Sequence, residues 1–149
     1  MDEMFTELQQ MIDEDMRRTY SETVIDHAMN PRNMGRLKEA DGWARHTGPC
    51  GDTLEMWIRV SGGEIEEVRF LSDGCGTSVA SGSMATELAR GKTVDEALEI
   101  GQREVLEALD GLPEENEHCA LLAATTLKLA IGDYLKRVAE PWKKAYDRR

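Results

Sequence analysis

Three cysteines, each beside residues that can bind metal or shape a loop, are the residues with the clearest chemistry in this sequence. The first lies in Gly48-Pro49-Cys50-Gly51-Asp52. Pro49 restricts the backbone and Gly51 lets it turn, so the side chains of Cys50 and Asp52 can point at one centre. An ordinary turn before a strand, with a buried cysteine, is the alternative that this motif favours when taken alone.

The second cysteine lies in Asp73-Gly74-Cys75-Gly76, between a predicted strand and a predicted helix. Flanking glycines leave room for a cluster close to the backbone, where amide groups can donate hydrogen bonds to its sulfurs. A helix N-terminus also lowers the pKa of a thiol by favouring the thiolate, which binds metal and attacks sulfur. A tight turn with an inert cysteine is the alternative for this segment alone.

The third motif is His118-Cys119, at the start of the predicted final helix. Neighbouring residues on a helix point about 100° apart, which suits shared ligation of one centre better than a catalytic hydrogen bond. The long spacings match neither zinc fingers nor ferredoxin motifs. We therefore predict one joint metal centre formed by Cys50, Asp52, Cys75 and Cys119, with His118 nearby. His27 and His46 have no ligand spacing to the cysteines, and we predict no metal-binding role for them.

The N-terminal part of the chain predicts two helices. Apolar residues at helical spacing, with acids between them, predict an amphipathic helix that covers the core or packs on a neighbouring protomer. Ser21 is a plausible cap for a second, short helix that Asn30-Pro31 should end. The apolar stripe of the first helix consists of Met4, Phe5, Leu8, Met11, Ile12 and Met16.

The middle of the chain predicts an antiparallel sheet. Apolar residues alternate with polar ones and Trp57 between residues 54 and 60, and a second strand covers residues 65–71. The connection Ser61-Gly62-Gly63 is too short for a crossover, so the two strands form a hairpin. A third strand is expected near residues 43–47.

The rest of the chain is predicted to be helical. A helix runs from Thr77 to Gly91, and its expected apolar face consists of Val79, Ala80, Met84, Leu88 and Ala89. Two short helices follow within residues 93–100 and 104–109, and a long helix covers about residues 119–138. The prediction is an α+β fold, in which helices cover one face of a small three-stranded antiparallel sheet.

Length and charge limit the function classes. The chain has 149 residues and a net charge of −11, which disfavours nucleic acid and anionic lipid as partners. No apolar run reaches membrane-spanning length and no signal peptide is recognisable, so we expect a cytoplasmic protein with free or metal-bound thiols. We divide it into an N-terminal helical extension (1–19), one domain (20–140) and a basic tail (141–149).

These residues resemble the IscU-type iron–sulfur cluster scaffolds, which also form the N-terminal domain of NifU. The resemblance covers about residues 20–135 and implies the α+β fold. The matching motifs are Tyr20-Ser21-Glu22, Val24-Ile25-Asp26-His27, Asn30-Pro31-Arg32-Asn33, Cys50-Gly51-Asp52, Gly74-Cys75-Gly76, Leu112-Pro113 and His118-Cys119.

The resemblance also implies a carrier rather than an enzyme. Cys50, Cys75 and Cys119 would bind a [2Fe–2S] cluster or accept sulfur from a cysteine desulfurase, with Asp52 and His118 near or on the metal. The cluster would pass to acceptor apoproteins. In the family, Leu-Pro-Pro-Val-Lys before His-Cys is the site of a chaperone pair; residues 112–116 here read Leu-Pro-Glu-Glu-Asn, so we expect little chaperone recognition.

The same thiols are compatible with two other classes of function. A zinc-bound persulfide acceptor of the SufU type could use the same Asp and Cys residues in a tetrahedron, and zinc is expected in some preparations. By resemblance, that type has a long insertion after the second cysteine's helix and a lysine before the last cysteine, and this sequence has neither. A thiol oxidoreductase would need a Cys-x-x-Cys pair, which is also absent.

Overall fold

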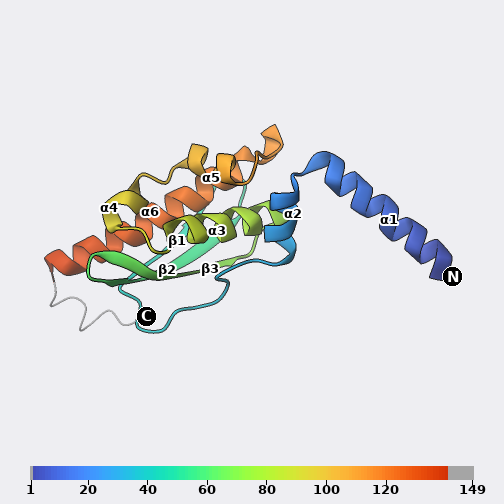
Figure 1. The fold of residues 1–149 in the computed structure, drawn as a ribbon. Coiled ribbons are helices and arrows are strands. Elements are labelled where there is room, and N and C mark those ends of the chain that lie inside the picture. Colours follow the sequence, from blue (N-terminus) through green and yellow to red (C-terminus); the bar gives the residue numbers. More distant parts are fainter. Residues whose placement is uncertain (1, 141–149) are drawn as a thin grey trace.

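The structure is a computed structural model that describes residues 2–140, so the predicted basic tail lies outside the described residues. It is the α+β fold expected from the sequence, with a three-stranded sheet and a long final helix (Figure 1). The elements are α1 (Asp2–Thr19), α2 (Glu22–Met29), β1 (Gly42–Thr47), β2 (Thr53–Ser61), β3 (Glu64–Ser72), α3 (Gly76–Ala89), α4 (Val94–Leu98), α5 (Gln102–Ala108), the 3-10 helix η1 (Glu114–Asn116) and α6 (Glu117–Ala139).

The sheet has the order β1-β2-β3, and both strand pairs are antiparallel. Gly62 and Gly63 form the turn of the hairpin with φ angles of +60° and +81°, in the left-handed region that favours glycine. Leu54, Met56 and Ile58 are fully buried in the core cluster. The predicted hairpin and third strand are confirmed.

Helices α3 and α6 cover one face of the sheet. Helix α6 contacts β1 and β2, while α3 contacts β3, α2 and α6. A Cβ atom at Gly82 of α3 would lie 2.7 Å from the Phe70 ring on β3, so only glycine permits this approach. The tight packing fixes the N-terminal ends of α3 and α6 next to the sheet.

The predicted apolar face of α3 is only partly correct. Val79 and Leu88 are half-buried, whereas small polar residues on the other sides of the helix are buried. The reason is that α2, α6 and β3 surround α3, so small side chains suit every side of it. The buried polar residues are Thr77, Ser78, Ser81, Ser83 and Thr86.

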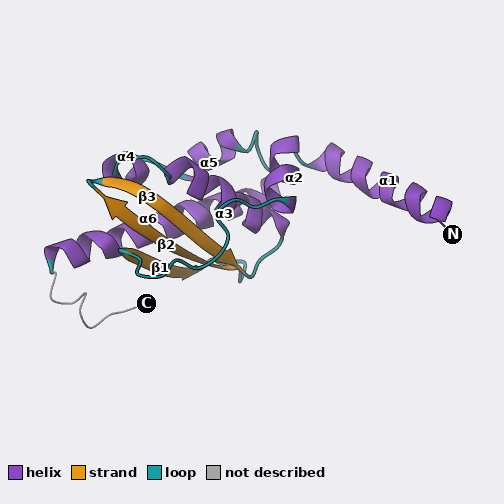
Figure 2. Ribbon diagram, turned by 60° about the horizontal axis from the view of Figure 1, so that its bottom comes forward, coloured by secondary structure: helices purple, strands orange, loops and turns teal. Residues whose placement is uncertain are grey.

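The opposite face of the sheet is covered in part by the loop between α2 and β1 (Figure 2). Leu37 and Ala40 from this loop form a second small cluster with Trp57. Trp57, which alternates with the core residues of β2, is therefore only 5% exposed. The loop is also tied to β3, because the Gly35 N–H donates a hydrogen bond to the carbonyl of Phe70.

Helix α1 forms as predicted, but it does not cover the core. None of its residues is buried, and five of its six stripe residues are exposed, with Phe5 at 69% and Met11 at 64%, while Met16 is half-buried. It contacts α2, and its N-terminal part projects away from the rest of the described chain in Figures 1 and 2. The expected cover of the core is therefore not seen within this chain, and packing of the stripe on a neighbouring protomer stays a prediction.

Candidate metal centre

Three potential metal ligands from distant parts of the chain meet at one end of the sheet. Asp52 lies just before β2, Cys75 is the N-cap residue of α3, and Cys119 lies in the first turn of α6. One ligand atom from each lies within 4.8 Å of the other two. Cys119 is buried, Asp52 is half-buried and Cys75 is exposed, so the group extends from the core to the surface.

Hydrogen bonds in two loops hold Asp52 close to the segment that carries Cys75. The turn before β2 is closed by the Gly48 N–H, which donates to the Asp52 carbonyl at 2.9 Å. At the start of β2, the Thr53 N–H donates to the Asp73 carboxylate at 2.7 Å. This second bond ties the start of β2 to the end of β3, where the Cys75 segment begins.

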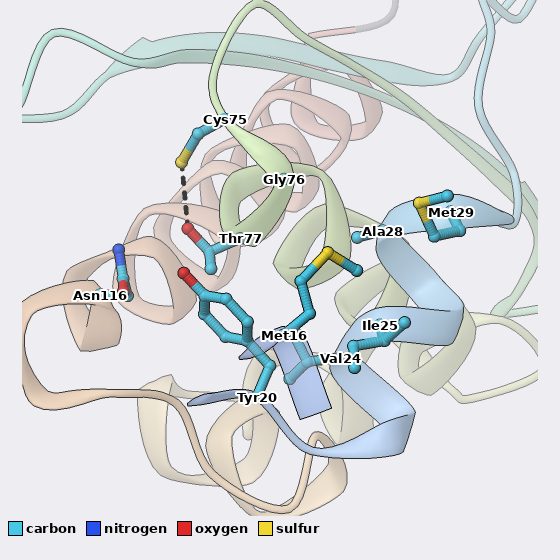
Figure 3. Close-up of a pocket in the computed structure, with 10 residues that line it drawn as sticks. All are labelled: Met16, Tyr20, Val24, Ile25, Ala28, Met29, Cys75, Gly76, Thr77 and Asn116. Atoms are coloured by element: carbon cyan, nitrogen blue, oxygen red, sulfur yellow. Dashed lines mark hydrogen bonds between the residues drawn. The ribbon is translucent and has the colours of Figure 1, made fainter. Parts of the chain in front are cut away.

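The surroundings of Cys75 favour its thiolate. Burial raises the pKa of the Cys75 thiol, but the hydroxyl of Thr77 and the backbone N–H groups of Ser78 and Thr77 outweigh it and lower the pKa. The Thr77 Oγ1 lies 3.0 Å from the Cys75 Sγ (Figure 3). The position at a helix N-terminus thus gives the activated thiol that the sequence predicts.

The surroundings of Cys119 have the opposite effect. Burial raises the pKa of the Cys119 thiol, the nearby Cys75 and Asp52 raise it further, and hydrogen bonds from Ser78 and Thr77 only partly offset this. The two oxygens lie 3.5 Å (Ser78) and 3.4 Å (Thr77) from the Cys119 Sγ. Cys119 is therefore a buried ligand candidate that must lose its proton when metal binds.

Cys50 and His118 do not belong to the group of three. Cys50 is exposed in the loop two residues before Asp52. The Nε2 atom of His118 lies 3.7 Å from the Cys119 Sγ, at the edge of the group. Their roles as ligands stay predictions. His27 lies elsewhere, buried in α2, with its Nδ1 atom 2.7 Å from the Ser83 hydroxyl.

A mostly apolar cavity of about 420 Å³ adjoins Cys75 (Figure 3). Met16 and Tyr20 contribute to it from the end of α1 and the segment that follows. The sequence motifs did not single out this cavity, because its lining comes from segments far apart in the chain. Its other lining residues are Val24, Ile25, Ala28, Met29, Gly76, Thr77 and Asn116.

Comparison with known proteins identifies the family. The sequence profile described as the NifU-like N terminal domain matches residues 19–141, most of the chain. The chain belongs to this family. Among curated relatives, it is 46% identical over 119 residues to iron-sulfur cluster assembly scaffold protein IscU 1 of Archaeoglobus fulgidus, which covers 79% of this chain and 78% of the relative. It is 43% identical over 120 residues to the IscU scaffold of Escherichia coli, covering 77% and 93%.

Solved structures support the same fold for this NifU-like chain. The N-terminal part of a NifU-like protein from Brucella abortus superposes with a TM-score of 0.62 at 19% identity, over 78% of this chain and 94% of that one. A putative iron-sulfur cluster assembly scaffold of the SUF system from Fervidobacterium islandicum gives 0.62 at 24% identity, over 75% and 96%. At these identities, the likeness concerns the fold alone.

Proposed function

We propose that this protein is a scaffold on which a labile [2Fe–2S] cluster is assembled and from which it passes to acceptor apoproteins. The observation that carries the proposal is the convergence of Asp52, Cys75 and Cys119 within 4.8 Å of one another. Thiolates bind iron strongly, whereas a carboxylate is a harder and weaker ligand for such a cluster. This mixed set suits temporary holding better than permanent storage, and the scaffold names of relatives at 42% to 46% identity support it.

The cluster is a cargo in this proposal, and the protein acts as a carrier. Cys75 and Cys119 supply thiolates, Asp52 supplies a carboxylate, and Cys50 and His118 complete the predicted set. Cys75 is also the sulfur acceptor, because its thiol is exposed and its pKa is lowered. Its thiolate would attack the outer sulfur of a desulfurase persulfide, forming a new persulfide on Cys75 and releasing the desulfurase cysteine as a thiolate.

The partners in this proposal are a cysteine desulfurase, acceptor apoproteins and a second copy of the chain. Helix α1 supports self-association, because most of its apolar stripe is exposed and is not covered by the rest of the described chain. A chaperone pair is not included, since Glu114 and Glu115 replace the family's consensus residues.

Location and bound metal follow from the thiols. All three cysteines are free, which suits a reducing compartment, so we place the protein in the cytoplasm. None of the described helices is long and apolar enough to cross a membrane. Zinc is the competing metal for the same thiolates, and a zinc-bound persulfide acceptor is the second candidate function.

Anaerobic reconstitution with iron and a sulfur source tests the proposal. Wild-type protein is expected to gain the visible absorbance of a [2Fe–2S] cluster, with iron and sulfide but little zinc on metal analysis. Cys50→Ser, Cys75→Ser and Cys119→Ser should each abolish or sharply weaken this binding while far-UV circular dichroism stays unchanged. Normal cluster yield in all three variants, or a stable zinc site that excludes iron, would contradict the scaffold function.

A further inference from the structure

A serine hydroxyl lies among the three ligand candidates. Ser78 is fully buried in the first turn of α3, three residues after Cys75. Its Oγ atom lies 2.5 Å from the Asp52 Oδ2, 3.5 Å from the Cys119 Sγ and 3.9 Å from the Cys75 Sγ. None of the sequence motifs gives Ser78 a role, although it is the hydroxyl residue that contacts all three.

The Ser78 hydroxyl donates its main hydrogen bond to Asp52, and the Cys119 Sγ at 3.5 Å is a weaker acceptor of the same proton. A serine hydroxyl has one proton to donate, and the carboxylate oxygen is both the nearest and the strongest acceptor around Ser78. The same Oδ2 atom lies 4.0 Å from the Cys75 Sγ. The hydrogen bond therefore holds the carboxylate of Asp52 beside the sulfur atoms, instead of leaving it free to turn toward solvent.

The backbone around this hydrogen bond leaves room for it. A Cβ atom at Gly74 would lie 2.6 Å from the Asp52 Oδ2 and 2.8 Å from the Ser78 Oγ. The φ angle of Gly74 is not in the left-handed region, so glycine is needed here for space rather than for backbone conformation. The absence of a side chain at Gly74 is thus a second, independent observation that the surrounding residues fix the position of the Asp52 carboxylate.

We propose that Ser78 is a positioning residue, whose hydroxyl holds the Asp52 carboxylate in the geometry that binds the cargo metal. This inference rests on the proposed function, because it takes Asp52 as a ligand. Partners that hydrogen-bond a metal ligand orient it, and their loss typically weakens metal binding about 10- to 100-fold. Ser78 also favours the Cys75 thiolate, more through its backbone N–H, which substitution by alanine leaves in place, than through its hydroxyl, which lies 3.9 Å from the Cys75 Sγ.

Two metal-binding measurements provide the test. Titration with Co²⁺ gives the binding spectrum, and competition with a chelator for Zn²⁺ gives the affinity of the site. Ser78→Ala is expected to weaken Co²⁺ binding about 10-fold or more. It should also change the ligand-field absorption of the Co²⁺ that still binds, because the carboxylate is displaced. The thiolate-to-cobalt charge-transfer bands should persist, since every cysteine is retained. Far-UV circular dichroism and thermal unfolding without metal report whether the variant still folds.

Ser81→Ala is the matched control. Ser81 is also fully buried in α3, one turn further along, and its hydroxyl has no hydrogen-bond partner among the described residues. The same substitution there removes a buried hydroxyl without touching Asp52, so metal affinity should stay unchanged. Gly74→Ala is a second test variant, which crowds the Asp52 carboxylate while Ser78 is intact, and it should weaken Co²⁺ binding as Ser78→Ala does.

A double-mutant cycle separates positioning from general packing. If Ser78 acts through Asp52, Ser78→Ala should cost no further affinity once Asp52→Ala is present. An equal loss in both backgrounds, or unchanged Co²⁺ affinity and spectrum in Ser78→Ala, would overturn the inference while the scaffold function stands. Failure of wild-type protein to bind Co²⁺ or an iron–sulfur cluster at all would refute the proposed function and this inference with it.

Discussion

The hydroxyl of Thr77 lies 3.0 Å from the sulfur of Cys75, two residues earlier in the chain. The same oxygen lies 3.4 Å from the sulfur of Cys119, 42 residues later. One hydroxyl therefore links an exposed thiol with a lowered pKa to a buried thiol with a raised pKa. The difference between these two thiols underlies the first prediction.

Substitution of Thr77 by valine should raise the pKa of the Cys75 thiol. Valine keeps the shape of threonine but removes the hydroxyl, which is the strongest of the hydrogen bonds that lower this pKa. The rate of alkylation by iodoacetamide, followed against pH by mass spectrometry, should therefore rise at higher pH than in the wild type. In both proteins, the buried Cys119 should react much more slowly than Cys75.

The measurement is made in a Cys50→Ser background, which removes the other exposed cysteine, so that alkylation reports on Cys75. Ser81→Ala, which removes a buried hydroxyl elsewhere in α3, should leave the alkylation profile where it is. Identical profiles for Thr77→Val and its parent would show that the thiolate is stabilised without the Thr77 hydroxyl, by the backbone N–H groups and the Ser78 hydroxyl.

Replacement of Asp52 by alanine should give a longer-lived cluster in air together with slower transfer to an acceptor apoprotein. In the proposed function, the carboxylate is the exchangeable ligand and the polar entry point for water and acceptor thiols, so we expect its loss to affect both processes. Decay of the visible absorbance and transfer to an apo-ferredoxin measure the two effects. If Asp52 merely stabilises its turn, the variant loses about 1 kcal/mol of stability and cluster lifetime does not change.

Stability should fall as the pH drops below about 6.5 because of His27. Burial lowers the pKa of His27 below its usual value of 6.5, and nearby Arg32 lowers it further, while Asp26 and Glu87 partly oppose the shift. The unfolded chain then binds the proton more readily than the folded chain, so acid favours unfolding. The contribution of His27 to the free energy of unfolding is fully present above pH 6.5, and it is lost as the pH falls toward the pKa of His27 in the folded state.

The substitution His27→Gln should flatten this part of the pH profile, as measured by thermal unfolding of metal-free protein between pH 5 and pH 8. His46→Gln is the control, because His46 lies half-buried on β1, away from α2. Equal slopes for wild type and His27→Gln would show that another group controls stability in this range.

The fold could be predicted from the sequence where the spacing of apolar residues shows which face of an element is buried. The hairpin of β2 and β3 follows from alternation and a Gly-Gly turn, and α2 begins after the predicted cap, where the Ser21 hydroxyl accepts a hydrogen bond from the Val24 N–H. Helix α3 could not be predicted in the same way. Its neighbours on several sides bury serine and threonine side chains, which carry no apolar signal.

The residues of the candidate site could be predicted from the sequence, but their arrangement in space could not. Glycine neighbours and element ends drew attention to Cys75 and Asp52, yet only the packing of β2, α3 and α6 brings Cys119 to them. Ser78 could not be recognised, because a serine in a helix is common and its role depends on a carboxylate 26 residues earlier.

Deletion of residues 1–19 should change the oligomeric state more than the stability of the remaining domain. Helix α1 buries none of its side chains, so little intramolecular packing is lost, while an exposed apolar stripe is removed. Sedimentation velocity and thermal unfolding of both proteins measure the two effects. Phe5→Glu with Leu8→Glu is a milder variant that should act in the same direction. A change in neither property would contradict self-association through this helix.

The gradient of burial across Asp52, Cys75 and Cys119 has a consequence for delivery. A cargo bound there is anchored at its inner side by a sulfur that solvent cannot reach, and it is open at its outer side. We expect an incoming thiol to replace the outer ligands one at a time while the bond to Cys119 prevents escape into solution. In the proposed function, the cargo is therefore not free during the exchange, and we expect release to finish only when the receiving protein already holds most of it.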